Sequence, residues 1–226
     1  MKDNINNLST FKAYLVPLII MIVMGLVLFL PAGSLKFWEA WIWWSIISAL
    51  TLFITTYFLK KDPGILSRRM KVREKEQQPG IIRILSFLSL FAYLIPGFDY
   101  RYHWSAVPVW IIIAANALVF LGYVFIFLVF KENSYASTII QVEKEQQVIT
   151  TGPYAIVRHP MYTGLLIMQL FTPLALSSYW ALIFSFLFIP TIIFRIRKEE
   201  EVLLRDLPGY TDYFTKTRYR LIPSVW

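Results

Sequence analysis

The chain of 226 residues is 57% hydrophobic and only 16% charged, whereas ordinary globular proteins carry about a quarter charged residues. It contains no cysteine, which excludes disulfides and thiolate chemistry, and its two histidines, His103 and His159, disfavour a histidine-based metal centre. The net charge of +8 fits basic loops beside anionic lipid headgroups and requires no nucleic-acid partner.

Four apolar stretches approach the roughly 20 residues that a membrane-spanning helix needs. They are residues 13–30, 38–59, 81–98 and 107–130. The first follows a polar start and is too long for the core of a signal peptide, so we expect a retained anchor. The fourth contains no charged residue, which disfavours a channel or a pump.

A helical hairpin is predicted after the long polar segment 131–160. Residues 161–194 carry no charge and are too long for one untilted helix, and Ser177 and Ser178 stand at their middle. The chain then divides into a transmembrane region, 1–130, and a core, 131–226, which holds a cytoplasmic segment, the hairpin and a charged, aromatic tail. The expected fold class is an all-α integral membrane protein with about six membrane-embedded helices, four spans plus the hairpin.

Orientation is predicted from the distribution of basic residues. If residues 60–83 face the cytoplasm, alternation of the spans places all but Lys36 and Arg101 of the 22 lysines and arginines on that side. Both termini are then cytoplasmic in this multi-pass arrangement. The lack of a targeting signal favours a prokaryotic plasma membrane, although an endoplasmic-reticulum membrane would give the same pattern.

Two polar pieces flank the hairpin and should therefore meet at the same membrane face. In the first, 152–164, Pro160 suits the first position of a helix, and the free N–H groups there form an anion site together with Arg158 and His159. The second, 195–204, brings three consecutive glutamates. Each piece also has a plain structural interpretation, as interfacial anchors and as helix-spaced charge pairs.

Taken together, four elements resemble a known family. They are Gly-Pro-Tyr at 152–154, Arg-His-Pro-Met-Tyr at 158–162, Glu-Glu at 199–200, and Leu-Pro-Gly-Tyr through Tyr-Arg-Leu-Ile-Pro at 207–223. This combination resembles the isoprenylcysteine carboxyl methyltransferase family, which is related to the phospholipid methyltransferases. The resemblance extends over about residues 131–226, and the first four spans match only in hydropathy.

The resemblance implies an enzyme that transfers a methyl group from S-adenosylmethionine, held on the cytoplasmic side, to a lipidic or prenylated small acceptor. Methylation of a carboxylate oxygen is the expected reaction. By matching position, the cofactor would be bound by Gln141, Gln146, Val148, Ile149, Tyr154, His159, Pro160, Met161, Tyr162 and Glu199. Three further residues are expected to be catalytic. Arg195 faces the acceptor, Arg158 or the helix N-terminus binds the carboxylate of the cofactor, and Glu200 or His159 takes a proton if the acceptor is an amine. The tail, with Leu207, Tyr210 and Tyr213, is expected to cap the hairpin and also to cover the cofactor.

Other functions stay open at this stage. The fourth span lacks the arginine that eukaryotic relatives carry there, so a prenylated cysteine is not assigned as the acceptor, and a phospholipid N-methyltransferase is an alternative. A membrane reductase of the sterol-reductase type would need basic residues for the 2′-phosphate of NADPH; the glutamates at 199–201 disfavour it, while Arg195 and Arg197 leave it open. A scaffold without activity is the third hypothesis. The oligomeric state is not predicted.

Overall fold

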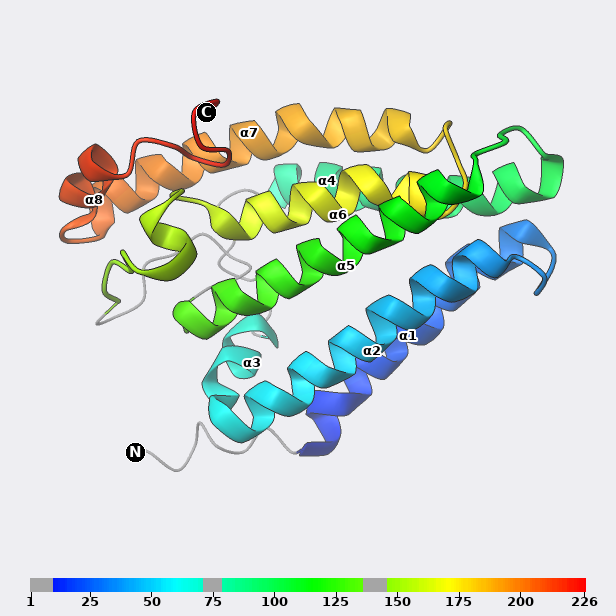
Figure 1. Cartoon of the computed structure of the whole chain (residues 1–226). Coiled ribbons are helices and arrows are strands. Elements are labelled where there is room, and N and C mark those ends of the chain that lie inside the picture. The colour runs from blue at the N-terminus through cyan, green and yellow to red at the C-terminus, as the bar shows by residue number, and fades with distance from the viewer. Residues whose placement is uncertain (1–9, 71–78, 136–145) are drawn as a thin grey trace.

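The computed structural model describes residues 10–70, 79–135 and 146–226, and these residues form helices and connecting turns without any strand (Figure 1). The helices are α1 (Thr10–Ala32), α2 (Trp38–Lys61), α3 (Pro63–Met70), α4 (Pro79–Tyr102), α5 (Val109–Glu132), the 3-10 turn η2 (Gly152–Ala155), α6 (Pro160–Ala175), α7 (Leu182–Asp206) and α8 (Tyr210–Lys216). The expected all-α membrane fold is confirmed.

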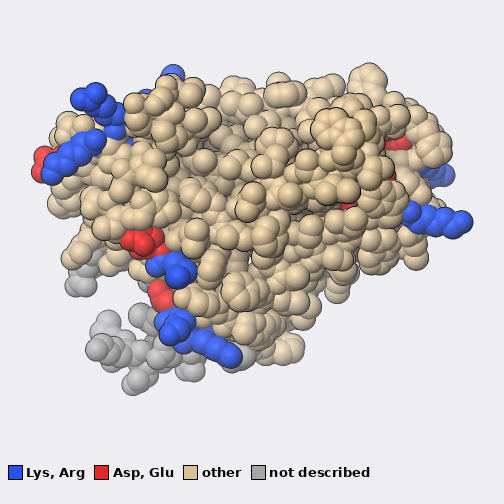
Figure 2. Space-filling model, viewed as in Figure 1, with Lys and Arg blue, Asp and Glu red and all other residues tan. Residues whose placement is uncertain are grey.

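Four of these helices, α1, α2, α4 and α5, are long and apolar enough to cross a membrane. Three begin and end within three residues of the predicted spans. The remaining helix, α4, corresponds to the predicted span 81–98 and runs four residues past its end. The helix continues through Pro96 and packs against α1. Figure 2 shows an uncharged surface over the middle of the bundle, with charged side chains toward its two ends, as expected for a protein embedded in a bilayer.

Helix α3 was not expected from the sequence, because Pro63 and Gly64 are residue types that usually mark a turn or a loop. Pro63 instead begins a helix, a position where its missing N–H is not needed. The carboxylate of Asp62 accepts a hydrogen bond of 3.1 Å from the N–H of Gly64 in this first turn. Ile65 is buried and packs with side chains of α2 and α5, so α3 folds back onto the bundle.

The hairpin is formed by α6 and α7, and its turn is anchored by a buried carboxylate. Ser177, in the turn, adopts a left-handed conformation with φ of 58°. Asp99, at the end of α4, accepts hydrogen bonds from the hydroxyls of Ser178 at 2.5 Å and Ser105 at 2.7 Å, and from the N–H of Ser105 at 2.7 Å. Its side chain is almost fully buried, so three donors compensate the lost hydration and fix the turn against the loop between α4 and α5.

Helices α5 and α6 approach closely at two glycines. A Cβ atom on Gly164 would lie 2.6 Å from Cγ1 of Ile126 and 3.1 Å from the carbonyl oxygen of Gly122. Small residues of this kind let helix backbones come together in membranes, where packing rather than exclusion of water drives association. This contact positions the start of α6 beside the end of α5, where the polar residues of the chain gather.

Candidate functional site

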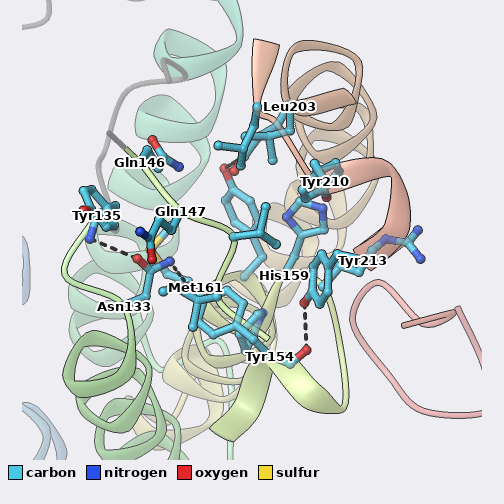
Figure 3. A pocket seen from close by; sticks show the side chains of 17 residues that line it. Asn133, Tyr135, Gln146, Gln147, Tyr154, His159, Met161, Leu203, Tyr210 and Tyr213 are labelled. Atoms are coloured by element: carbon cyan, nitrogen blue, oxygen red, sulfur yellow. Dashed lines mark hydrogen bonds between the residues drawn. The ribbon is translucent and has the colours of Figure 1, made fainter. Parts of the chain in front are cut away.

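A pocket opens at the end of the bundle where α5 ends and α6 begins (Figure 3). Together with its open mouth and the solvent in it, the pocket encloses about 800 Å³. Its walls come from the end of α5, the segment 146–149, η2, the start of α6, the last turns of α7, and α8. The lining residues are Asn133, Tyr135, Gln146, Gln147, Val148, Ile149, Tyr154, Arg158, His159, Pro160, Met161, Tyr162, Glu199, Leu203, Leu207, Tyr210 and Tyr213.

The turn η2 supplies Tyr154, which two hydrogen bonds hold in place. Asn133 Nδ2 donates to the hydroxyl of Tyr154 at 2.9 Å, and the hydroxyl of Tyr213 donates to its carbonyl oxygen at 2.7 Å. Burial raises the pKa of Tyr154 to about 12, partly offset by the bond from Asn133. The ring is therefore a fixed, neutral wall that ties α5 to α8.

The start of α6 is held by the tail of the chain. The backbone N–H groups of Arg158 and His159 donate to the carbonyl oxygens of Tyr219 and Arg220, both at 2.9 Å. Pro160 then takes the first helical position, as its fixed φ favours. The N-terminus of α6 consequently faces the pocket through Pro160, Met161 and Tyr162, which all line it.

A hydrogen-bonded chain leads from the pocket into α7. The hydroxyl of Tyr162 donates to Oε2 of Glu199 at 2.6 Å and accepts from Nε of Arg195 at 3.0 Å. Tyr162 and Glu199 line the pocket, whereas Arg195 lies one helical turn before Glu199 and is buried behind the lining. The chain therefore couples a carboxylate in the pocket to a buried cation on the same helix.

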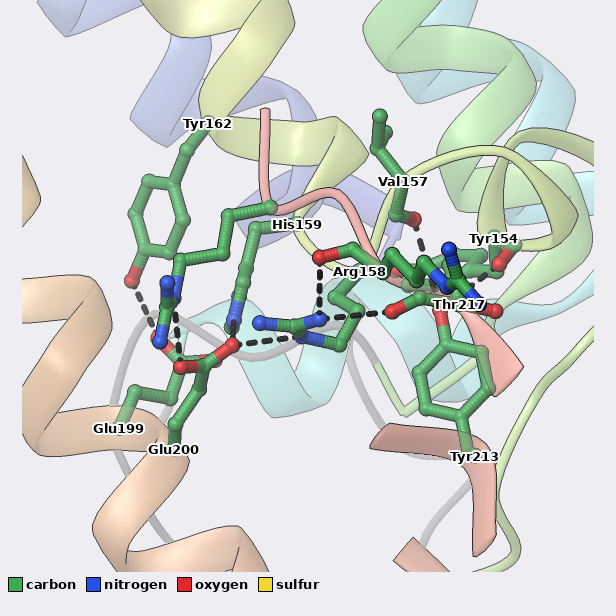
Figure 4. A network of polar contacts seen from close by, with 11 residues as sticks. Tyr154, Val157, Arg158, His159, Tyr162, Glu199, Glu200, Tyr213 and Thr217 are labelled. Carbon is green, nitrogen blue, oxygen red and sulfur yellow. Dashed lines mark hydrogen bonds and ion pairs between the residues drawn. The ribbon is translucent and has the colours of Figure 1, made fainter. Parts of the chain in front are cut away.

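Glu200 lies at the centre of a second, denser network (Figure 4). Its Oε1 accepts hydrogen bonds from Nε of Arg158 at 2.7 Å and Nε2 of His159 at 3.2 Å, and its Oε2 accepts one from Nε of Arg220 at 2.7 Å. Burial by itself raises the pKa of this carboxyl, but the bonds from His159, Arg158 and Arg220 outweigh burial and lower it to about 2. Glu200 is thus a permanent anion that holds α6, α7 and the tail together.

Arg158 has most of its guanidinium committed to the same network. Its Nη1 donates to the carbonyl oxygens of Thr217 at 2.6 Å and Arg218 at 2.8 Å, and its Cζ lies 4.3 Å from the ring centroid of Phe214. One side of this cation therefore contacts the pocket while the other anchors the tail, so a change at this residue affects both.

The structure brings most of the residues expected from the sequence around one pocket. Nine of the ten expected cofactor-binding residues line it, and Gln141 lies outside the described residues. Among the expected catalytic residues, Arg158 lines the pocket, whereas Arg195 and Glu200 lie behind the lining and contact it through Tyr162, Arg158 and His159. Glu200 therefore positions other residues, whereas Arg195 places a buried positive charge beside Tyr162.

Three lining residues were not expected from the sequence: Asn133, Tyr135 and Leu203. Gln147 belongs to the segment 146–149 that matches the family less firmly, and the tail residues Leu207, Tyr210 and Tyr213 were expected to cap the hairpin and cover the cofactor. Two features of the sequence indicate some of these positions. Leu203 follows Glu199 by one helical turn, so it shares the same face of α7. Gly209, with φ of 81°, reverses the chain after α7, and the Pro-Gly pair at 208–209 marks this turn, which returns Tyr210 and Tyr213 over the pocket.

Residues 110–208 match the model of the phospholipid methyltransferase family. The chain also has the fold of a solved eukaryotic intramembrane Ras methyltransferase, ICMT (isoprenylcysteine carboxyl methyltransferase), with a TM-score of 0.57, 20% identity, and coverage of 90% of this chain and 74% of that one. The expected resemblance is confirmed. The phospholipid methyltransferase match includes the pocket wall from α5 to Leu207 and ends before Tyr210 and Tyr213.

A curated relative gives a weaker match. The nickel-cobalt-cadmium resistance protein NccN of Alcaligenes xylosoxydans xylosoxydans is 29% identical over 143 residues. These residues amount to 61% of this chain and 61% of that protein, so the chain spans less than two thirds of the relative's length. Within the described ranges, no group of three or more His, Cys, Asp or Glu side chains is arranged to hold a metal ion.

Proposed function

We propose that this protein is an S-adenosylmethionine-dependent methyltransferase that acts on a lipidic or prenylated small acceptor at the membrane interface, with methylation of a carboxylate oxygen as the reaction. The observation that carries the proposal is the pocket itself. It combines aromatic walls, the carboxylate of Glu199 and the N-terminus of α6 at the end of an apolar bundle. A water-soluble cofactor and an acceptor from the bilayer can both reach such a place.

The lining fits the chemical groups of S-adenosylmethionine. Glu199 can accept hydrogen bonds from ribose hydroxyls or from an ammonium group, and the rings of Tyr154 and Tyr210 offer faces to an adenine or a sulfonium. The hydroxyl of Tyr210 is buried and has no hydrogen-bond partner among the described residues, so a polar ligand atom would satisfy it. When bound, the cofactor supplies an activated methyl group.

The residues around the pocket then have to position an ionised acceptor and exclude water, because displacement at an activated methyl carbon requires no covalent nucleophile. Arg195 supplies a buried positive charge beside Tyr162, and we assign it to the carboxylate of the acceptor. A carboxylate acceptor needs no general base. This agrees with Glu200, whose pKa of about 2 and three donors leave it no capacity to take a proton near neutral pH.

The two alternative enzymes have less support in the pocket. An amine acceptor would have to lose a proton to His159 or Glu200. The three hydrogen bonds of Glu200 disfavour it as the base, and Nε2 of His159 is already bound to Glu200 at 3.2 Å. NADPH would need several cations for its 2′-phosphate. Among the described lining residues Arg158 is the single arginine or lysine, and its Nε and Nη1 are already bound.

The location and organisation of the protein follow the same proposal. We place the pocket and both termini on the cytoplasmic side of the membrane, on the distribution of lysines and arginines. The core of 131–226 would carry the chemistry, and membrane lipids would surround the spans of 1–130.

Titration calorimetry of the detergent-purified protein tests the proposal. We expect S-adenosylhomocysteine to bind one-to-one with micromolar affinity and NADPH not to bind. Glu199→Gln should weaken this binding about tenfold or more, because a hydrogen bond to a charged group contributes about 1.5–3 kcal/mol. Glu201→Gln, two residues further along α7 and outside the lining, should leave it unchanged. Arg195→Gln should retain binding and lose methyl transfer. Folded wild-type protein that binds NADPH, or neither compound, would refute the proposal.

A further inference from the structure

Tyr210 differs from the neighbouring tyrosines of the pocket. The hydroxyls of Tyr154, Tyr162 and Tyr213 all have partners within the protein, in Asn133, Glu199 with Arg195, and the carbonyl oxygen of Tyr154 respectively. Tyr210 is 3% exposed, lines the same pocket, and its hydroxyl has no hydrogen-bond partner among the residues that the structure describes. A buried polar atom without a partner destabilises the folded protein, so it calls for an explanation.

The ring of Tyr210 is fixed in its position over the pocket. Gly209 takes the left-handed conformation that turns the chain, and Tyr210 begins α8 directly after it. The ring centroid lies 5.7 Å from that of Tyr213 and 6.5 Å from that of Phe214. Leu207 packs in the same cluster. Because these contacts hold the ring, the hydroxyl cannot move to solvent without losing packing at the junction of α7 and α8.

The surroundings also define what the hydroxyl can bind. Burial, and next the negative charges of Glu200 and Glu199, raise the pKa of Tyr210 far above its ordinary value. The phenol therefore stays protonated and offers a hydrogen for donation. A partner must present an oxygen or nitrogen lone pair, such as a carboxylate, a hydroxyl or an adenine nitrogen.

We propose that Tyr210 is a ligand-binding residue whose hydroxyl donates a hydrogen bond to an acceptor atom of the molecule bound in the pocket. This inference rests on the proposed function, in which that molecule is S-adenosylmethionine. It extends the site beyond residues 110–208, which match the phospholipid methyltransferase model, and makes α8 a wall that contacts the ligand. The hydroxyl of Tyr213, by contrast, donates its hydrogen bond to the carbonyl oxygen of Tyr154 in η2 and so supports this wall.

Two measurements on Tyr210→Phe test the inference, titration calorimetry with S-adenosylhomocysteine and thermal unfolding of the ligand-free protein. We expect the dissociation constant to rise about tenfold, as for one lost hydrogen bond. The unfolding temperature should stay equal or rise, because the substitution removes a buried hydroxyl that has no partner. Tyr14→Phe is the control. Its hydroxyl lies 3.0 Å from Oγ1 of Thr56, away from the pocket, so its affinity should match wild type.

The inference is overturned if Tyr210→Phe binds S-adenosylhomocysteine as wild type does. It is also overturned if the substitution lowers the unfolding temperature of the ligand-free protein, because the hydroxyl would then bond within the protein. A wild-type protein that does not bind S-adenosylhomocysteine refutes the proposed function instead. In that case the unfolding temperatures of wild type and Tyr210→Phe decide the inference. An unfolding temperature that Tyr210→Phe does not lower supports a hydroxyl that bonds to a ligand and not within the protein.

Discussion

Substitution of Glu200 by glutamine should destabilise the protein more than any other single-charge change near the pocket. The carboxylate is 3% exposed and accepts hydrogen bonds from Arg158, His159 and Arg220. Its pKa falls from 4.5 to about 2, and one pKa unit corresponds to about 1.4 kcal/mol, so the folded protein favours the ionised form by about 3 kcal/mol. Removing one partner from a buried ion pair costs about 3–5 kcal/mol in other proteins, which is consistent.

Thermal unfolding in detergent, followed by tryptophan fluorescence, measures this effect. For a domain of this size about 3 kcal/mol corresponds to a loss of roughly 6–12 °C in the unfolding temperature. The matched control is Glu201→Gln, the same substitution at the next residue. Glu201 pairs with Lys198 at 2.8 Å, but its side chain is 62% exposed, and exposed pairs contribute only about 0–1 kcal/mol. Equal unfolding temperatures for the two variants would refute the reasoning.

The carboxylate of Glu200 should also make the stability of the protein depend on pH. Because the folded pKa lies below 4.5, its contribution to stability is complete above about pH 5 and is lost as the pH falls toward 2. The unfolding temperature of wild type should therefore fall more steeply than that of Glu200→Gln between pH 5 and 3. Parallel curves would show that Glu200 is not the titrating group. Limited proteolysis should also release the tail sooner in the variant, since Arg220 loses its partner.

Two further substitutions test the packing of the bundle. Gly97→Ala should lower the free energy of unfolding by about 1–3 kcal/mol, because its Cβ would lie 2.7 Å from the main-chain oxygen of Leu28. The control Gly80→Ala, on the same helix, meets nothing within 4 Å and should be neutral or stabilising. Equal unfolding temperatures for the two variants would contradict the close approach of α1 and α4. Asp99→Asn should lower the unfolding temperature, because an amide cannot accept all the bonds that the carboxylate takes from Ser105 and Ser178. The affinity for S-adenosylhomocysteine should not change, and a weaker affinity would show that the hairpin turn influences the pocket.

The long helices could be predicted because apolar residues continue over lengths that only a membrane requires. The hairpin was equally visible, since no charge interrupts 161–194 and its turn lies at Ser177 and Ser178 as expected. Helix α3 could not be predicted, because it depends on tertiary contacts. Pro63 and Gly64 have the composition of a break, and only the packing of Ile65 against α2 and α5 makes them the start of a helix.

The candidate site shows the same division. Motifs at 152–162 and 199–200 gave residues that do line one pocket, because a hairpin returns its two ends to the same side. The resemblance assigned Glu199 to the cofactor and Glu200 to catalysis, but it could not predict that Glu200 lies behind the lining and accepts three hydrogen bonds. Their difference arises from a helical rotation of about 100°, which directs Glu199 into the pocket and Glu200 toward Arg158, His159 and Arg220.

All described residues that line the pocket lie between 133 and 213, and α1 to α4 contribute none. One continuous stretch of the gene therefore encodes the whole described wall, while α1, α2 and α4 are long and apolar enough to cross a membrane. Mutations in the first half can then accumulate, or that half can be exchanged by recombination, without altering the wall directly. Under the proposed function, such an exchange would leave in place the residues that line the cofactor site.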